Sequence, residues 1–479
     1  MQFKKTLLAT SALMSAVAWA PQAHAIPAFA RQVGMPCSAC HYQHFPTLNG
    51  FGRSFKAAGF TMVGSEEKIE TTDSPGLSIP AVLNLAFVTN LAYVKQNGPT
   101  TGTTATTKTT NNGQFQMTQY SLFMGGRVSN NIGFEGEVGL SGGAALASVK
   151  MPFSFDVAGG KLGVVPFTTD GLGPQQGFEP LSDGATPVHL FNQQDLAAIG
   201  AYEYLTGFNG AGSVNGITAG GAVPANGAAL YYYNDMGFVN FTKWQIDSIN
   251  GNGPGQAPGA AGGGSPTSNY FRLAWTPGDV GGFDTAVGLQ YFSGASSSTS
   301  TALPGTLAAG FTNGTGAAIA GAPGTFKTRA TEVDGQMMGD VSGMPLTLIA
   351  SYATAPASDP GATLANGGFN AFNPYLGTRK SFNIGGELGV IPNKATLQLG
   401  IRRASSGQYV PGSGNVVAGT SGNATDNAIM VGATYSLALN VRAELTYSKY
   451  SGDMYNSTAS AQAGYMGDSM TVLNLWMGF

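Results

Sequence analysis

From residue 78 to the C-terminus, apolar and polar residues alternate with a period of two, and this pattern most constrains the fold. In segment 441–448, Val, Ala, Leu and Tyr alternate with Arg, Glu, Thr and Ser. Segments 132–138, 382–388 and 397–402 follow the same rule. A period of two places one set of residues on each face of a β-strand. The pattern predicts either a transmembrane barrel with its apolar side chains outward or a soluble sandwich with its apolar side chains inward.

The lengths of the connections distinguish these two folds. Short turns are expected at 129–131, 234–237, 391–394 and 437–440. They alternate with long Gly-, Thr- and Ser-rich segments, as short periplasmic turns and long outer loops do in bacterial barrels. The eight long segments lie near residues 97–112, 143–183, 206–226, 250–267, 295–326, 355–380, 405–424 and 453–466. We therefore predict a barrel of about 16 antiparallel strands over residues 78–479, and expect segment 143–183 to fold over or narrow the pore.

Composition and the C-terminus agree with a barrel. Only 10% of residues are charged, and 71 are glycine. Beyond the N-terminal leader no stretch stays apolar for about 18 residues, which argues against helical membrane spans. The net charge of −3 gives no basis for nucleic-acid binding. The final strand alternates up to a terminal Phe479, which resembles the assembly signal of outer-membrane barrel proteins; its apolar set is Thr471, Leu473, Leu475 and Met477.

Residues 1–25 have the features of a secretory signal peptide. Lys4 and Lys5 give a basic start, and residues 7–20 form an apolar core. Ala23-His24-Ala25 is a small-x-small cleavage site. We expect an exported chain that begins near Ile26.

Residues 26–64 form a distinct segment that contains the pattern Cys37-Ser38-Ala39-Cys40-His41. C-x-x-C-H is the attachment motif of c-type haem: both thiols form thioethers, and the imidazole is an axial ligand of the iron. Zinc, a thioredoxin-like redox pair and a plain disulfide are alternative uses of C-x-x-C. The chain has only two cysteines, and a structural zinc site needs about four ligands. We predict one covalent haem c held by Cys37, Cys40 and His41.

The rest of this segment predicts a small helical unit. Leu48, Phe51 and Phe55 recur near helical spacing, and Gly59 is placed to end the helix. We expect aromatic residues such as Phe45 and Phe60 to enclose the haem. A unit of this size has little core of its own, so an enclosing wall would have to supply the remainder. Residues 65–77 are expected to be a linker.

The second axial ligand is less determined by the sequence. Met62 ends the segment, and a methionine ligand raises the potential of a haem relative to two histidines. His44 and His189 are the alternatives. His44 follows His41 too closely to reach the opposite face easily.

Charged residues of the N-terminal segment and of the barrel strands are further candidates for functional contacts. Arg31, Arg53 and Lys56 are expected to pair with haem propionates, with barrel carboxylates or with solvent. Eight charged residues of the barrel stand at the polar positions of the period-two alternation and should therefore face the lumen: Glu135, Glu137, Glu332, Asp334, Glu387, Arg402, Arg442 and Glu444. The carboxylates among them would offer transient sites for iron.

The N-terminal segment resembles a known family. The segment is similar to that of the fused monohaem cytochrome c–porin outer-membrane iron(II) oxidases of iron-oxidising bacteria in the runs 27–32, 37–41, 44–46, 48–49, 51–53, 55–56 and 59–62. The barrel resembles that family in length and pattern only. The resemblance implies an all-β transmembrane barrel with a small α-helical c-type cytochrome segment. It also implies an iron(II):cytochrome c oxidoreductase in which His41 is the catalytic ligand, and Cys37, Cys40 and Met62 complete the haem site.

The resulting hypothesis places the protein in the bacterial outer membrane, in contact with its lipid. The cytochrome segment lies in the barrel lumen or on the periplasmic side, and its haem brings oxidised iron close to the outer surface. Extracellular iron(II) gives one electron to the haem, which passes it to a periplasmic c-type cytochrome or another carrier. Alternatives are a conduit for another extracellular donor or acceptor, a porin whose haem segment hangs in the periplasm, and a structural barrel with an unused motif.

Overall fold

The structure of the chain is a computed structural model. It describes residues 27–45, 47–64, 67–71, 76–81, 83–96, 112–140, 145–169, 173–181, 225–246, 268–298, 324–357, 359, 370, 372–373, 377–407, 423–452 and 469–479. The signal peptide and His189 lie outside these ranges.

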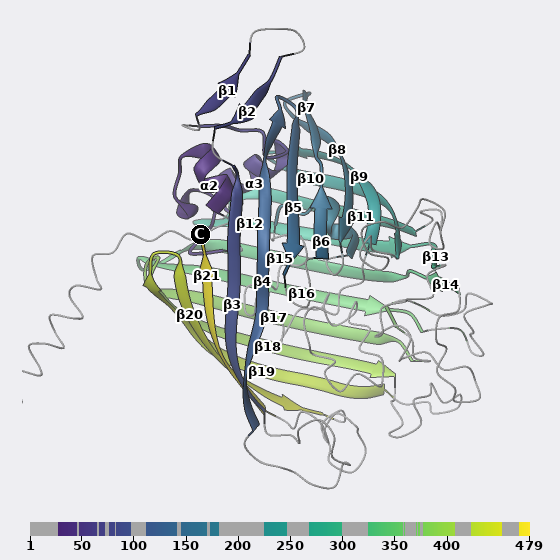
Figure 1. Cartoon of the computed structure of the whole chain (residues 1–479). Coiled ribbons are helices and arrows are strands. Elements are labelled where there is room, and N and C mark those ends of the chain that lie inside the picture. Colours follow the sequence, from purple (N-terminus) through teal and green to yellow (C-terminus); the bar gives the residue numbers. More distant parts are fainter. Residues whose placement is uncertain are drawn as a thin grey trace, which may run out of the picture.

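The described strands close into one antiparallel barrel (Figure 1). Strands adjacent in sequence are adjacent in the ring, and the last strand pairs with the first. The ring has 16 strands, because β6 and β7 are two halves of one strand that both pair with β8. The break falls at Met151 and Pro152, and proline has no amide hydrogen for the ladder. The predicted barrel and strand number are confirmed.

The strands of the ring have the following bounds: β3 Leu85–Gln96, β4 Asn112–Ser129, β5 Ile132–Gly139, β6 Ala145–Lys150, β7 Phe153–Val157, β8 Gly160–Thr169, β9 Ala225–Asn234, β10 Gly237–Ile246, β11 Ser268–Asp279, β12 Phe283–Ser293, β15 Ala330–Val341, β16 Met344–Ala355, β17 Arg379–Ile391, β18 Ala395–Gly407, β19 Asn423–Ala438, β20 Val441–Ser451 and β21 Ser469–Gly478.

Two small hairpins lie outside the ring. β1 (Lys68–Glu70) pairs with β2 (Ser78–Pro80), and β13 (Ala295–Ser298) pairs with β14 (Gly324–Lys327). The barrel therefore begins at Leu85 rather than at residue 78, and the expected linker contains a strand. Figure 1 shows the β1–β2 hairpin standing away from the barrel, beside the helices.

The expectation of a long loop at 143–183 is wrong for most of its length. Three strand segments, β6 to β8, occupy residues 145–169. Ala145, Ala147, Gly160 and Gly163 belong to these strands, and Ala158 and Gly159 form the turn between β7 and β8. Only the last part, 173–181, with its short 3₁₀ helix η2 (Gly173–Gly177), lies inside the barrel as expected, and all of its residues are buried.

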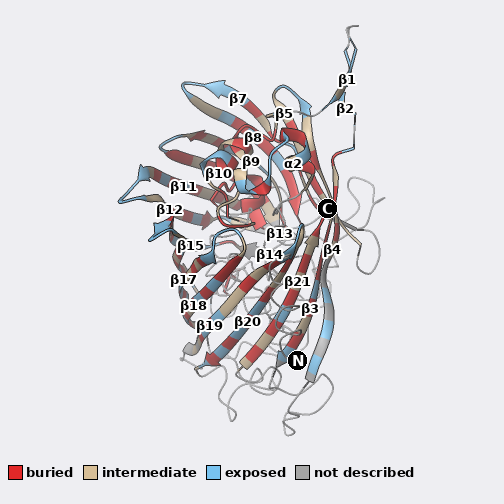
Figure 2. Cartoon of the chain, turned by 90° about the vertical axis from the view of Figure 1, so that its left-hand side faces the viewer, coloured by how far each residue is buried: buried red, intermediate tan, exposed pale blue. Residues whose placement is uncertain are grey.

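Burial alternates along the strands as the parity predicts (Figure 2). In β20, Arg442, Glu444 and Thr446 are buried, whereas Leu445 and Tyr447 are exposed. The exposed set is apolar and faces outward, and the buried set is polar and faces the lumen. The alternation therefore runs opposite to that of a soluble sandwich.

The helices lie at the end of the barrel that carries the short turns and the C-terminus (Figure 1). They are α2 (Pro27–Val33), the 3₁₀ turn η1 (Cys37–Ala39) and α3 (Gly50–Ala57). Asn49 caps α3 by accepting a hydrogen bond from the Gly52 amide, and Gly59 follows the helix with φ +67°, as expected of its C-terminal glycine. No described helix is long and apolar enough to cross a membrane.

Candidate functional site

The predicted haem-attachment residues share one tight turn. The amides of Cys40 and His41 both donate to the Cys37 carbonyl, at 3.1 and 2.9 Å. Cys37 is buried, and Cys40 and His41 are half-buried. Cys37 and Cys40 are not joined by a disulfide, so the disulfide alternative is not the arrangement seen here. Burial raises the pKa of the Cys40 thiol.

The turn is held against the start of α3. The Asn49 amide donates to the Cys40 carbonyl at 2.9 Å, and the Asn49 side chain donates to the Ala39 carbonyl at 3.0 Å. Gly52 lies so close that a Cβ there would be 2.2 Å from the Cys40 carbonyl oxygen. Only glycine permits this approach of helix and motif.

An apolar cluster forms the rest of the segment. Phe29 stacks on Phe60 at 4.8 Å and contacts Phe55 edge-on at 5.3 Å. Met62 packs against this cluster together with Val33. The Gln32 side chain fixes the chain there by donating to the carbonyls of residues 60 and 62, at 2.6 and 2.7 Å. Met62 thus lies in apolar surroundings, and its role as the second axial ligand stays a prediction.

His44 is engaged by the barrel wall instead of being available to a haem. Its Nε2 lies 2.5 Å from Glu387 Oε1, and its Nδ1 lies 2.6 Å from an Arg442 nitrogen. Nδ1 also lies 2.5 Å from the Phe45 carbonyl oxygen. Both nitrogens are occupied and all three side chains are buried. Coordination of iron through either nitrogen would break the contacts that this nitrogen makes.

Neighbouring residues extend this contact across β15 to β21. The Tyr42 hydroxyl donates to the Gly339 carbonyl at 2.6 Å, and burial beside Asp340 raises the pKa of Tyr42 to about 12. The Gln43 side chain donates to Thr347 and to the Glu387 carbonyl. The Phe45 ring lies 5.6 Å from His41 and 6.5 Å from Trp476 of β21. The barrel wall thereby contacts the immediate neighbours of the motif.

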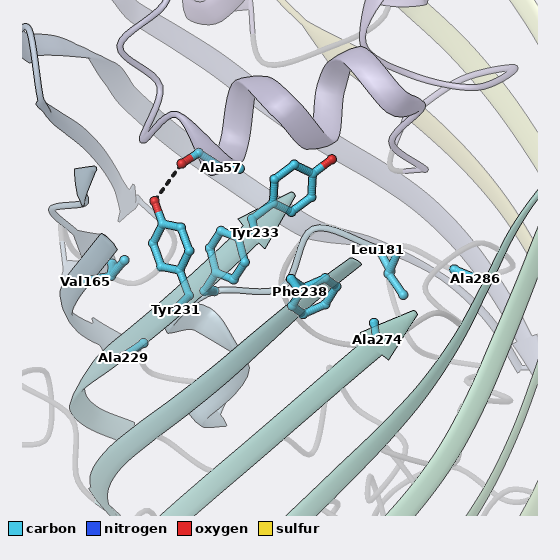
Figure 3. Close-up of a cluster of buried hydrophobic side chains, with 10 residues drawn as sticks. Ala57, Val165, Leu181, Ala229, Tyr231, Tyr233, Phe238, Ala274 and Ala286 are labelled. Carbon is cyan, nitrogen blue, oxygen red and sulfur yellow. Dashed lines mark hydrogen bonds between the residues drawn. The ribbon is translucent and has the colours of Figure 1, made fainter. Parts of the chain in front are cut away.

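The opposite side of the segment docks on β7, β9 and β12. Arg53 pairs with Asp284 at 2.6 Å, which confirms the barrel-carboxylate reading of this cation. The Ala57 carbonyl accepts from Tyr231 at 2.7 Å and from Ser154 at 2.9 Å, and Figure 3 shows the Tyr231 contact. The Arg31 side chain donates to the Leu85 carbonyl. The segment is therefore held on several sides of the barrel mouth.

The eight charged residues predicted to face the lumen all do so. Six are buried, and Glu135 and Glu137 are half-buried. Within the described ranges, no group of three or more His, Cys, Asp and Glu side chains could hold a metal ion. Three of these carboxylates form ion pairs: Glu135 with Lys150 at 3.1 Å, Asp334 with Arg272 at 2.5 Å and Glu387 with His44 at 2.5 Å.

Sequence reasoning missed one buried cluster. Arg272 of β11 donates to Asp334 of β15 at 2.5 and 2.9 Å and to Glu179 of the inward segment at 2.7 Å. Parity could have placed Arg272 in the lumen. Glu179 carries no such signal, because it lies outside any strand.

The residues present fit a covalently attached haem. Two unbridged thiols lie three positions apart on one turn, with a half-buried imidazole next to them. Aromatic side chains lie on the segment beside the turn. A porphyrin supplies four iron ligands itself, so the protein needs to provide only the axial ones.

Comparisons with known proteins add little to this picture. No family model and no curated protein matches the chain. Among solved structures, OmpT of Vibrio cholerae is 9% identical over 82% of this chain and 97% of its own, with a TM-score of 0.44. OmpF of Salmonella typhi is 13% identical over 86% and 100%, with a TM-score of 0.45. An anion-selective porin of Comamonas acidovorans has a TM-score of 0.41 at 13% identity, again over 86% and 100%.

Removal of the Glu387 carboxylate should loosen the docked segment. In a Glu387→Leu variant, His44 and Thr396 lose a buried acceptor and Arg442 loses a nearby negative charge, which should destabilise docking by about 3–5 kcal/mol. Glu387→Gln keeps an acceptor oxygen and should have a smaller effect. The measurement is the protease concentration that cleaves residues 27–64 in the folded barrel.

The matched control is Asp156→Asn. Asp156 pairs with Lys161 at the surface, where its side chain is 82% exposed, so the change should be under about 1 kcal/mol. Equal protease resistance of Glu387→Leu and the parent protein would contradict the docking role.

Proposed function

We propose that this protein is an outer-membrane cytochrome–porin that takes electrons from extracellular iron(II). The electron passes through one haem c to a periplasmic c-type cytochrome or another carrier. The observation that carries the proposal is a C-x-x-C-H turn docked within the mouth of a closed barrel by buried polar contacts. The choice of iron(II) rests on the resemblance of residues 27–62 to cytochrome–porin iron oxidases.

The outward face of the barrel supports a place in a membrane. Apolar side chains stand exposed on strands all round the ring, among them Leu399, Ile384, Val431 and Leu473. A soluble monomer rarely exposes so continuous an apolar surface. A closed ring pairs the backbone groups of its strands, as a lipid environment requires. Short turns at the end bearing the C-terminus are typical of the periplasmic side.

In this orientation the haem segment closes the periplasmic mouth of the barrel. A donor outside the cell then reaches it through the lumen, and not at the outer surface as the sequence alone suggested. A periplasmic acceptor meets the solvent-facing side of the segment, where Met35 and Phe51 are exposed. The docking contacts also disfavour a segment that hangs free in the periplasm.

Each site residue has a distinct role in this proposal. Cys37 and Cys40 fix the cofactor covalently, and His41 is the first axial ligand. Met62 is the proposed second axial ligand. The bound haem would supply reversible one-electron chemistry, while the chain sets its position, its ligands and its access to water.

Substitution on the outward face tests the membrane assignment. Leu399→Arg should destabilise the barrel by about 2–4 kcal/mol in lipid vesicles, because a cation near the bilayer centre loses its hydration. Leu399→Phe, the matched control, should be nearly neutral. Denaturant titration of the vesicle-embedded protein measures both. An equal stability of the two variants would argue against lipid contact at this position.

Substitution of the proposed thioether cysteines or of the proposed axial histidine tests the haem assignment. Cys37→Ser with Cys40→Ser should abolish covalent haem, measured as haem that stays with the denatured chain on a gel. His41→Ala should keep the thioethers but change the axial-ligand bands of the absorption spectrum. Cys-free protein that still carries covalent haem would refute the assignment.

Iron(II) titration tests the electron donor. Oxidised outer membranes that contain the protein should show the reduced-haem α-band after iron(II) is added, and membranes with the Cys37→Ser and Cys40→Ser variant should not. Reduction by other extracellular donors, with none by iron(II), would establish a conduit but overturn the oxidase proposal. Reduction only by a small permeant reductant would point to a haem that faces the periplasm alone.

A further inference from the structure

Exposed cations on the outward face of the barrel gather at the long-loop end. Five of them follow one another along one half of the ring, from β15 through β16 to β3. Each lies within four residues of the strand end that leads to a long loop. They are Arg329, which directly precedes β15, Lys380 of β17, Arg403 of β18, Lys449 of β20 and Lys95 of β3. Lys243 of β10 is exposed at the same end, on the other side of the ring.

These cations stand at the edge of the apolar outward band. On β17 the next outward positions after Lys380 are Phe382 and Ile384, each 41% exposed. On β20 the outward position before Lys449 is Tyr447, which is 45% exposed. A long cationic side chain at such an edge covers apolar surface with its stem and holds its charge among polar groups. In a lipid bilayer this is the depth of the headgroups.

The two ends of the barrel differ in this respect. Among the ring-strand residues whose burial is described, the carboxylates face the lumen or lie beside the short turns. At the short-turn end, no described strand of the ring has an exposed cation on its outward face. The outward face therefore carries its exposed cations at one rim only.

The register places the five cations in a row that descends regularly from strand to strand. Through β16, Lys380 is level with Thr331, and Arg329 stands two residues above Thr331. Arg403 pairs with Phe382, two residues below Lys380. On β19 the partners of Arg403 and Lys449 are again two residues apart.

The last step of the row has the same size. On β21 the partners of Lys449 and Lys95 are two residues apart. From Arg329 to Lys95 the row thus descends by four steps of two residues, while it crosses seven strand-to-strand steps. The descent is about 1.1 residues for each strand crossed.

The tilt of the strands decides whether such a row is level, because a level line in a barrel runs obliquely to the ladder. In Figure 1, β3 and β4 cross the direction of β16 to β18. On the β12 side of the ring, the pairings join Thr331 at one level with Tyr291, Phe271, Phe241, Leu230, Val164, Phe153 and Ile132. Leu122 and Phe87 lie six residues above that level, and Lys95 lies eight residues above Phe87.

The two paths around the ring give the slope of a level line. By the β12 side Lys95 stands 14 residues above the level of Thr331, whereas by the row it stands six residues below. The difference of 20 residues is the shear of the barrel. Spread over 16 strands, it makes a level line descend by about 1.25 residues a strand in the direction of the row. The five cations therefore lie at nearly one height around half of the rim.

We propose that these five residues form a binding surface for the phosphate groups of lipopolysaccharide in the outer leaflet. Long loops mark this end as the outer one. Lysine and arginine make charge-assisted hydrogen bonds to phosphate, and cations near an anionic membrane surface are attracted to it. Lys380 and Arg403 are diagonal neighbours on adjacent strands, about 7–8 Å apart, so one phosphate can contact both. The inference goes beyond the proposed function and needs only its membrane orientation.

Lipid binding by the full-length, haem-loaded protein in detergent tests this surface. The test variant changes three neighbouring cations of the row: Arg329→Gln, Lys380→Gln and Arg403→Gln. The matched control removes the same charge at the short-turn end: Lys68→Gln, Lys161→Gln and Lys394→Gln. Heat-modifiable gel mobility confirms that each variant is folded. The probes are fluorescently labelled lipopolysaccharide, the same lipid after removal of its phosphates, and inorganic phosphate, in a buffer with a chelator of divalent cations.

The parent and the control variant should bind the phosphorylated lipid at least about tenfold more tightly than the dephosphorylated lipid, and less tightly at high salt. The test variant should lose at least about tenfold in affinity for the phosphorylated lipid. Equal affinities of the test and control variants, or equal binding of the two lipids by the parent, would overturn the proposal. Displacement of the lipid by inorganic phosphate at equal phosphate concentration would also overturn it, in favour of a site for small anions.

A haem-free variant separates this result from the proposed function. Protein with Cys37→Ser and Cys40→Ser should bind the lipid as the parent does, because the row lies at the end of the barrel opposite the motif. A failed iron(II) titration therefore leaves the lipid surface standing, and failed lipid binding leaves the electron-transfer proposal standing.

Discussion

Closure of the backbone ladder is the constraint on which the rest of this structure depends. A spanning segment in lipid must pair its amides and carbonyls within the protein, and an open sheet would leave two edges unpaired. Here β21 pairs with β3 over nine residues, and the amide and carbonyl of Phe479 bond to those of Phe87. Closure also creates an interior, so the strict alternation of side chains generates a lumen lined by polar groups.

That lumen makes so small an N-terminal unit feasible. The two helices have seven and eight residues, and helices shorter than about 12 residues are marginal in isolation. The segment has its own apolar cluster of Phe29, Phe55 and Phe60, but the wall adds buried contacts on several sides. Arg53 with Asp284 and His44 with Glu387 fix its rotation as well as its position. The barrel wall thus replaces the core that so short a segment cannot build.

Local sequence patterns correctly predicted which strand residues face the lumen and where the short turns lie. They could not predict contacts between residues that are far apart in the chain. Parity placed Glu387 and Arg442 in the lumen, and turn composition located the turns at 391–394 and 437–440. Nothing local indicated that His44 would contact a residue 343 positions away, because that contact requires the register of the whole ring. The region 143–183 was misjudged because small residues suit both loops and close-packed strands. Gly160 of β8 is an example: a Cβ there would lie 2.4 Å from the Tyr233 carbonyl oxygen of the neighbouring strand β9.

The docking contacts also bear on what can cross the barrel. Release of the segment into the periplasm would break the contact of His44 with Glu387, a buried pair whose loss costs about 3–5 kcal/mol. It would also break the Arg53–Asp284 pair, whose carboxylate is 34% exposed, and the hydrogen bonds to Ala57 and Gly339. A docked segment therefore obstructs the passage of solutes at the short-turn end, while the proposed haem at Cys37, Cys40 and His41 would still offer electrons a way through. In that proposal, the same contacts that stabilise the segment would separate electron transfer from diffusion, which suits a donor whose oxidised product should not enter the cell.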